Sequence, residues 1–203
     1  MSRIDAPLLN TVHLEFLYRP IYDIPQLPLF MLPKETFKLP LKIGASAYDD
    51  NVSIVVSSSS GGYFYLRFPC TGLYRQVSLL SHIFTQCSPL LSHVYRLDLY
   101  VSEKCDLQLD ERASMPWLKL LRSFDAVQIL YISSPALPGQ YDNLEIDIAR
   151  VLGNLTSERA AEVLPMMHTL LLRRFNQVGY LMTRLLKPFV NARQLSGQPV
   201  EVR

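Results

Sequence analysis

Residues 94–101, Val-Tyr-Arg-Leu-Asp-Leu-Tyr-Val, carry the pattern that decides the fold. The pattern is six residues long and has apolar residues at its first, fourth and sixth positions, here Val94, Leu97 and Leu99. The last three positions alternate with the period of a β-strand that has one buried face. The segment therefore predicts a strand whose leucines face the core.

Three more copies of this pattern occur along the chain, beginning at Leu9, Val127 and Met167. Segments with apolar residues at helical spacing lie between the copies. The expected helices cover about residues 74–87, a segment capped by Ser114, residues 144–152, a segment capped by Ser157, and residues 178–193. Strands joined by crossovers of this length are parallel, so the chain predicts an α/β fold with a mostly parallel sheet.

Polar residues alternate with apolar ones inside these strands, as His13 and Glu15 do in the first copy and Asp98 in the second. Strands buried between two helix layers would instead be near-continuous apolar runs. Helices are therefore expected on one face of the sheet only, and repetition of such a unit gives an irregular horseshoe solenoid. A doubly wound sheet that carries an enzyme site is the alternative.

Residues 41–68 interrupt the repeat. This segment holds three candidate strands, at 41–45, 52–56 and 64–68, and the loops between them are too short for a helical crossover. An antiparallel hairpin is therefore expected near 41–68, with turns at Asp49–Asn51 and at the serine and glycine run 57–62. The length of 203 residues suits one domain that spans residues 1–203.

Composition and charge narrow the classes of function. Basic and acidic residues nearly balance, with 20 against 18 and a formal net charge of +2, so nucleic acid is not an expected partner. No apolar run is long enough to cross a membrane. The three cysteines include no CxxC spacing, which favours a reducing compartment, so the chain is expected to be intracellular, either cytoplasmic or nuclear.

No motif for catalysis, for a cofactor or for a metal ion is found. The sequence contains no GxGxxG or GxxxxGK[ST] phosphate loop, no HExxH zinc motif and no GxSxG nucleophile elbow. No catalytic, cofactor-binding or metal-binding residue is therefore expected, and the chain is predicted not to be an enzyme.

The outward positions of a one-sided sheet form a ladder of side chains, which is the candidate partner-binding site. Its mixture of tyrosine, arginine and both signs of charge is typical of protein-binding surfaces. The ladder is predicted to contain His13, Glu15, Arg96, Asp98, Tyr100, Gln128, Tyr131, Thr169, Leu171 and Arg173. The expected partner is another protein, whose identity the ladder does not specify.

Four stretches of the chain, residues 5–9, 80–91, 158–165 and 188–200, resemble the repeat region of fungal F-box proteins. In that family an F-box is followed by degenerate leucine-rich repeats. The resemblance implies a leucine-rich-repeat-like solenoid that acts as the substrate-recognition part of a ubiquitin-ligase receptor, with a protein substrate as its partner.

The chain departs from this family in lacking an F-box. The string Leu32–Glu35 is similar to the opening of one, but the strand-like residues 41–45 follow where short helices should be. The ligase adaptor is therefore an expected partner only if an F-box exists upstream, and the domain is expected to lack an N-terminal cap. The alternatives are a free-standing interaction scaffold unrelated to ubiquitin and a truncated, non-functional fragment.

Overall fold

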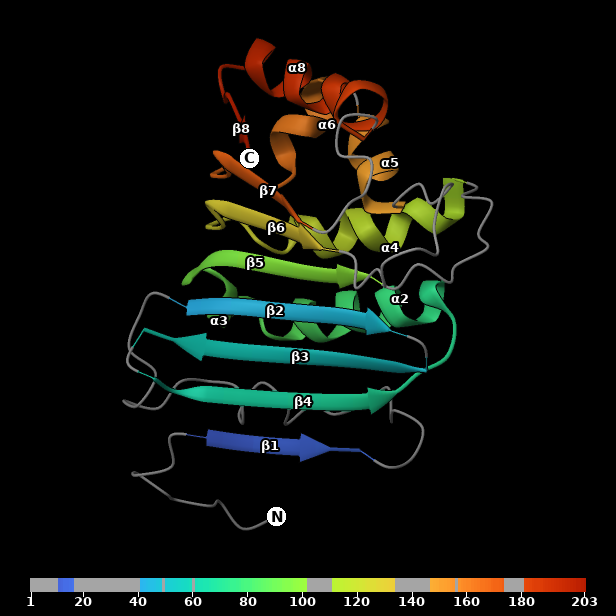
Figure 1. Cartoon of the computed structure of the whole chain (residues 1–203), viewed down its shortest axis with the longest axis vertical. Coiled ribbons are helices and arrows are strands. Elements are labelled where there is room, and N and C mark those ends of the chain that lie inside the picture. The colour runs from blue at the N-terminus through green and yellow to red at the C-terminus, as the bar shows by residue number, and fades with distance from the viewer. Residues whose placement is uncertain are drawn as a thin grey trace.

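The computed structural model of the chain describes residues 11–16, 41–48, 50–59, 61–101, 111–133, 147–155, 157–173 and 181–203. These residues form one open eight-stranded sheet in the order β1-β4-β3-β2-β5-β6-β7-β8, with β1 and β8 at its two edges (Figure 1). The strands are β1 (Thr11–Glu15), β2 (Leu41–Tyr48), β3 (Asn51–Ser58), β4 (Tyr63–Pro69), β5 (Val94–Val101), β6 (Ile129–Ser133), β7 (Thr169–Arg173) and β8 (Glu201–Val202).

The sheet is mostly parallel, as the repeated pattern predicts. Strands β2, β5, β6, β7 and β8 pair in parallel in that order, and β1 pairs in parallel with β4. Only β3 runs in the opposite direction within the described sheet, because it pairs antiparallel with both β2 and β4. The expectation of an antiparallel hairpin near 41–68 is confirmed. Short turns join β2 to β3 and β3 to β4, and Gly61 adopts φ 89° in the second of them.

The helices described in the structure lie on one face of this sheet (Figure 1). They are α2 (Leu73–Gln86), α3 (Ser88–Leu91), α4 (Glu111–Arg122), α5 (Asp147–Gly153), α6 (Ser157–Glu162), the π-helix η1 (Leu181–Leu186) and α8 (Lys187–Leu195). A doubly wound sheet needs helices on both faces, so that alternative does not fit this part of the chain. Within the same residues, no helix combines the length and apolar character that crossing a membrane requires.

Apolar rows that cross the sheet explain the packing. Leu97, Leu130 and Leu170 are register partners on β5, β6 and β7, and each is buried on the helix side. Leu99, Ile132 and Leu172 form a second row two residues further on. The positions that define the sequence pattern thus stack from strand to strand, and the helices cover them.

Some element boundaries differ from the prediction. Helix α4 begins at Glu111, so Ser114 lies inside it and is not its cap. The expected helix over 178–193 is two elements in its described part, because Pro188 has no N–H to donate and the π-helix gives way to α8 next to it. Strand β8 was not predicted, since two residues are too few to show a period. The N–H of Glu201 nevertheless donates to the carbonyl of His168 at 2.9 Å and joins β8 to β7.

One buried arginine ties the last helix to the preceding turn. Arg193 on α8 has no solvent exposure (0%), and burial lowers the pKa of its guanidinium. Its nitrogens donate to backbone carbonyls at the end of α6 and in the turn that leads to β7, namely those of Ala160 (3.3 Å), Val163 (3.5 Å), Pro165 (3.3 Å) and Met167 (2.7 Å). Leu164 in this turn adopts φ 51°, a conformation that is costly for a residue with a Cβ. Arg193 therefore holds a strained turn in place.

Candidate protein-binding surface

The sheet face away from the helices carries three rows of side chains, which together are called the open face here. Strand registers place His13, Tyr65, Val55, Gly44, Asp98, Tyr131 and Leu171 in the middle row. On one side of it lie Thr11, Tyr63, Ser57, Lys42, Arg96, Ile129 and Thr169. On the other side lie Glu15, Arg67, Ser53, Ser46, Tyr100, Ser133 and Arg173.

The structure brings most of the predicted ladder together on this face. His13, Glu15, Arg96, Asp98, Tyr100, Tyr131, Thr169, Leu171 and Arg173 all occupy its rows. Gln128 does not, and its inclusion is corrected here. It lies one residue before β6, which begins at Ile129, and so it has no register partner in the sheet.

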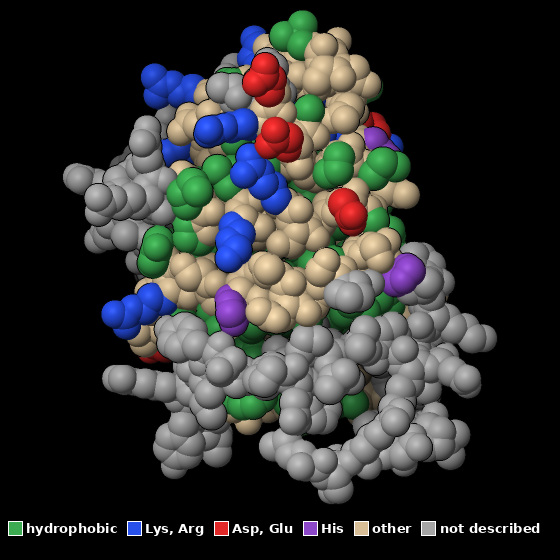
Figure 2. All heavy atoms as spheres, turned by 180° about the vertical axis from the view of Figure 1, so that it is seen from behind, with side chains coloured by type: hydrophobic (Ala, Val, Ile, Leu, Met, Phe, Trp, Pro, Cys, Tyr) green, Lys and Arg blue, Asp and Glu red, His purple; other side chains and the backbone are tan. Residues whose placement is uncertain are grey.

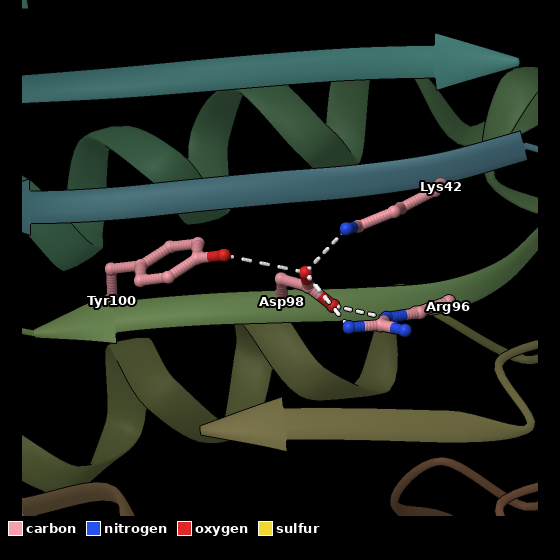
Figure 3. A network of polar contacts seen from close by, with 4 residues as sticks. All are labelled: Lys42, Arg96, Asp98 and Tyr100. Atoms are coloured by element: carbon pink, nitrogen blue, oxygen red, sulfur yellow. Dashed lines mark hydrogen bonds and ion pairs between the residues drawn. The ribbon is translucent and has the colours of Figure 1, made fainter. Parts of the chain in front are cut away.

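Asp98 is the centre of a polar cluster on the open face (Figure 3). Its carboxylate accepts a hydrogen bond from Arg96 Nε at 2.6 Å and forms an ion pair with Lys42 Nζ at 2.8 Å. The hydroxyl of Tyr100 donates to the same carboxylate at 3.4 Å. Strand β5 supplies three of these residues at alternate positions, and the adjacent β2 supplies Lys42. We call Lys42, Arg96, Asp98, Tyr100 and the neighbouring Tyr131 the Asp98 cluster.

The cluster explains how a carboxylate can be almost completely buried on an otherwise accessible face. The side chain of Asp98 is only 1% exposed, and burying a charge without partners would be very unfavourable. Two cations and one hydroxyl replace the lost water. The hydrogen bond to Asp98 raises the pKa of Arg96, and burial, together with the negative charge of Asp98, raises the pKa of Tyr100.

Aromatic rings form the other half of the cluster. The guanidinium carbon of Arg96 lies 5.4 Å from the centroid of the Tyr131 ring, within cation–π range. Tyr100 and Tyr131 contact edge to face, with ring centroids 5.8 Å apart. Tyr100 remains 39% exposed. The cluster therefore presents an aromatic ring to solvent as well as the two cations, Lys42 and Arg96, that pair with Asp98.

A second set of contacts occupies the β1 end of the open face. The rings of His13 and Tyr65 meet edge to face with centroids 4.4 Å apart. Arg67 Nη1 lies 3.3 Å from Glu15 Oε1, and both side chains are exposed. Such an exposed pair contributes little stability, of the order of 1 kcal/mol or less.

Lys42, Tyr63, Tyr65 and Arg67 were not among the predicted site residues, although they lie on the open face. They belong to β2 and β4, which the sequence analysis treated only as parts of a hairpin. The signal was present, since Tyr63, Tyr65 and Arg67 alternate with Phe64, Leu66 and Phe68. The period that places the phenylalanines in the core places the tyrosines on the other side.

Other chemistry is sparse in the described part of the chain. No group of three or more histidine, cysteine or acidic side chains is placed to hold a metal ion among these residues. Cys70 and Cys87 are buried, and burial raises the pKa of Cys87 to about 11. The helix-covered side of the molecule shows Lys and Arg side chains interspersed with Asp and Glu (Figure 2).

No protein family, no curated protein and no solved structure matches this chain. Its function is therefore inferred from the geometry of the open face and from the sequence resemblance stated above.

Proposed function

We propose that this chain is a protein-binding module, not an enzyme, and that its open face receives a protein partner. The single observation that carries the proposal is a sheet face free of described helices that displays tyrosines and arginines in register. Tyr63 and Tyr100 are both exposed there, and Arg96 stacks on Tyr131. Tyrosine and arginine are enriched among the residues that contribute most to binding energy at protein interfaces.

The dimensions of the open face support this proposal. Seven strands at about 4.8 Å spacing give roughly 34 Å in one direction, and three rows two residues apart give roughly 20 Å in the other. The resulting area of roughly 700 Å², before side-chain relief, is comparable with the roughly 800 Å² that each partner buries in a typical stable complex.

We further propose that the strand–helix units make an irregular leucine-rich-repeat-like solenoid, as in the substrate-recognition part of F-box receptors. Three observations support it: the parallel run from β5 to β7, the apolar rows that repeat from strand to strand, and helices confined to one face. On this proposal the partner is a substrate protein.

A free-standing interaction scaffold is the second candidate, and one observation favours it. Residues 41–58 form β2 and β3, so strands stand where the helices of an F-box would follow the string Leu32–Glu35. An adaptor-binding site is therefore not proposed within these strands.

Site-specific photo-crosslinking tests the binding surface. A photoreactive phenylalanine derivative replaces Tyr100 or Tyr63 on the open face, and in the matched control it replaces Tyr74, which lies on α2 and is 50% exposed. Each variant is irradiated in living cells. Protein adducts from positions 100 and 63, and none from 74, are expected. Adducts only from position 74, or none from any position, would refute the proposal.

The level of the crosslinked partner separates the two candidates. If the chain is part of a ligase receptor, its overproduction should lower the amount of that partner, and a proteasome inhibitor should restore it. An unchanged level in both conditions would leave the free-standing scaffold as the function.

A further inference from the structure

We infer that the segment bound by the open face is extended and acidic, and that its carboxylates lie over Lys42 and Arg96. This inference rests on the proposed function, since it specifies the chemistry of the partner at the same surface. It follows from the charges of the open face, from the burial of the Asp98 carboxylate and from the sizes of the side chains on that face.

Positive charge is in excess on the open face. The cations in its rows are Lys42, Arg67, Arg96 and Arg173, and the carboxylates are those of Glu15, Asp98 and Glu201, which continues the row of Thr169 onto β8. Glu15 and Arg67 pair with each other at the β1 end, and Glu201 pairs with Arg203 at the β8 end. The excess therefore lies over β2, β5 and β7, where Lys42, Arg96 and Arg173 outnumber the single carboxylate of Asp98.

Asp98 does not present its charge to a partner. Both of its oxygens accept from donors within the cluster, and its side chain is 1% exposed. Lys42 and Arg96 are more exposed, at 37% and 27%. A molecule that approaches β2 and β5 therefore meets two cations that share one buried carboxylate, and a carboxylate on the partner would compensate the remaining positive charge.

A strip of small side chains runs along the middle of the open face. The rows place Gly44 beside Val55 and Ser46 beside Ser53, and Lys42 stands at one end of the strip beside Ser57. Gly44 has only ordinary contacts near its missing Cβ, with Val55 Cβ at 3.6 Å and Tyr100 Cε2 at 3.8 Å. The serine hydroxyls of residues 46 and 53 are hydrogen-bonded to each other at 2.6 Å.

Larger side chains flank this strip on both sides. Tyr63, Tyr65 and Arg67 of β4 stand on one side. On the other side stand Arg96 and Tyr100 of β5. Three strand spacings separate β4 from β5, or about 14 Å, which matches one extended polypeptide whose side chains reach both walls. Such a segment would rest on the small residues and place acidic side chains beside Lys42 and Arg96.

The excess of charge suits a peptide better than a nucleic acid. A nucleic-acid surface neutralises many phosphates, whereas the whole chain has a formal net charge of only +2. A few carboxylates on a peptide match the small excess on the open face, and a basic segment would be repelled by it.

Selection from a displayed library of random peptides about twelve residues long tests the inference on the full chain, since such a peptide extends to roughly 40 Å and is longer than the strip. Recovered peptides are synthesised with a fluorescent label, and their affinities are measured by fluorescence anisotropy. We expect enrichment in Asp and Glu. Lys42→Gln and Lys42→Glu should each weaken binding roughly three- to tenfold, as should replacing the acids of the peptide by Asn and Gln. The matched control, Arg75→Glu in the first turn of α2, should change affinity less than about twofold.

The outcomes separate this inference from the proposed function. Peptides without acidic enrichment that still lose affinity on Tyr100→Ala would overturn the acidic partner and leave the binding surface in place. Equal or tighter binding of a labelled oligothymidine would overturn it in favour of nucleic acid. Recovery of no peptide, or of peptides indifferent to every open-face variant, would overturn it as well. Photo-crosslinking at positions 63, 74 and 100 then decides the proposed function on its own.

Discussion

Replacing Arg193 by methionine should remove a large part of the free energy of unfolding. The side chain is fully buried and donates to four backbone carbonyls, the shortest bond being 2.7 Å to Met167. A hydrogen bond from a charged donor contributes about 1.5–3 kcal/mol, and a buried carbonyl that loses its donor costs about 1–3 kcal/mol. The three longer bonds contribute less, and removing a buried charge returns part of its desolvation cost. The net loss should be about 3–5 kcal/mol.

Urea unfolding measures this loss, with the fluorescence of the single tryptophan as the probe. Trp117 lies on α4 and is 2% exposed, so its emission should shift when the core opens. The melting temperature should fall by about 2–4 °C for each kcal/mol lost. Arg159→Met on the exposed side of α6 is the matched control and should cost less than about 0.5 kcal/mol. A loss below about 1 kcal/mol for Arg193→Met would mean that the turn after α6 does not depend on this side chain.

Three further changes probe the packing. Gly153→Ala should destabilise the fold severely or prevent folding, because an added Cβ would lie 1.9 Å from the carbonyl oxygen of Leu185. Gly44→Ala is the control and should cost less than about 1 kcal/mol. Equal melting temperatures for the two variants would contradict the close approach of Leu185 to Gly153. Leu99→Ala should cost about 2–5 kcal/mol in urea unfolding, because Leu99 is buried in an apolar row, and a cost below about 1 kcal/mol would mean that the strand register is wrong. Burial raises the pKa of Cys87 to about 11. The protonated thiol therefore contributes its full stability at pH values below its ordinary pKa, and this contribution should be lost as the pH rises toward the raised pKa. The native chain should lose about 1–1.5 kcal/mol more than Cys87→Ala between about pH 8 and 10, and parallel pH profiles would contradict a thiol that stays protonated when folded.

The periodic parts of the chain were predictable. The alternation at Val94–Val101 and at its copies specified strands with one buried face, and the long connections between the copies specified parallel pairing. The short loops within 41–68 specified the antiparallel strands. Most of the predicted ladder also lies on one face. Gln128 was misplaced because β6 begins only at Ile129, one residue after it. Tyr63, Tyr65 and Arg67 were missed because their hairpin was not considered part of the repeating sheet.

The sequence by itself determined the buried face of each long strand, because the period of apolar side chains is a local property of the chain. The lengths of the connections determined which strands run parallel and which run antiparallel. Only the tertiary structure decided which strands are neighbours. The meander brings β4 beside β1 and β2 beside β5, and this pairing sets Lys42 against Asp98 across two strands whose residues lie far apart in the sequence. The same is true of Arg193, whose carbonyl partners lie on another helix and in the turn after it. Neither contact has a local period, since each depends on how separate elements pack, and so neither could be inferred from the order of residues alone.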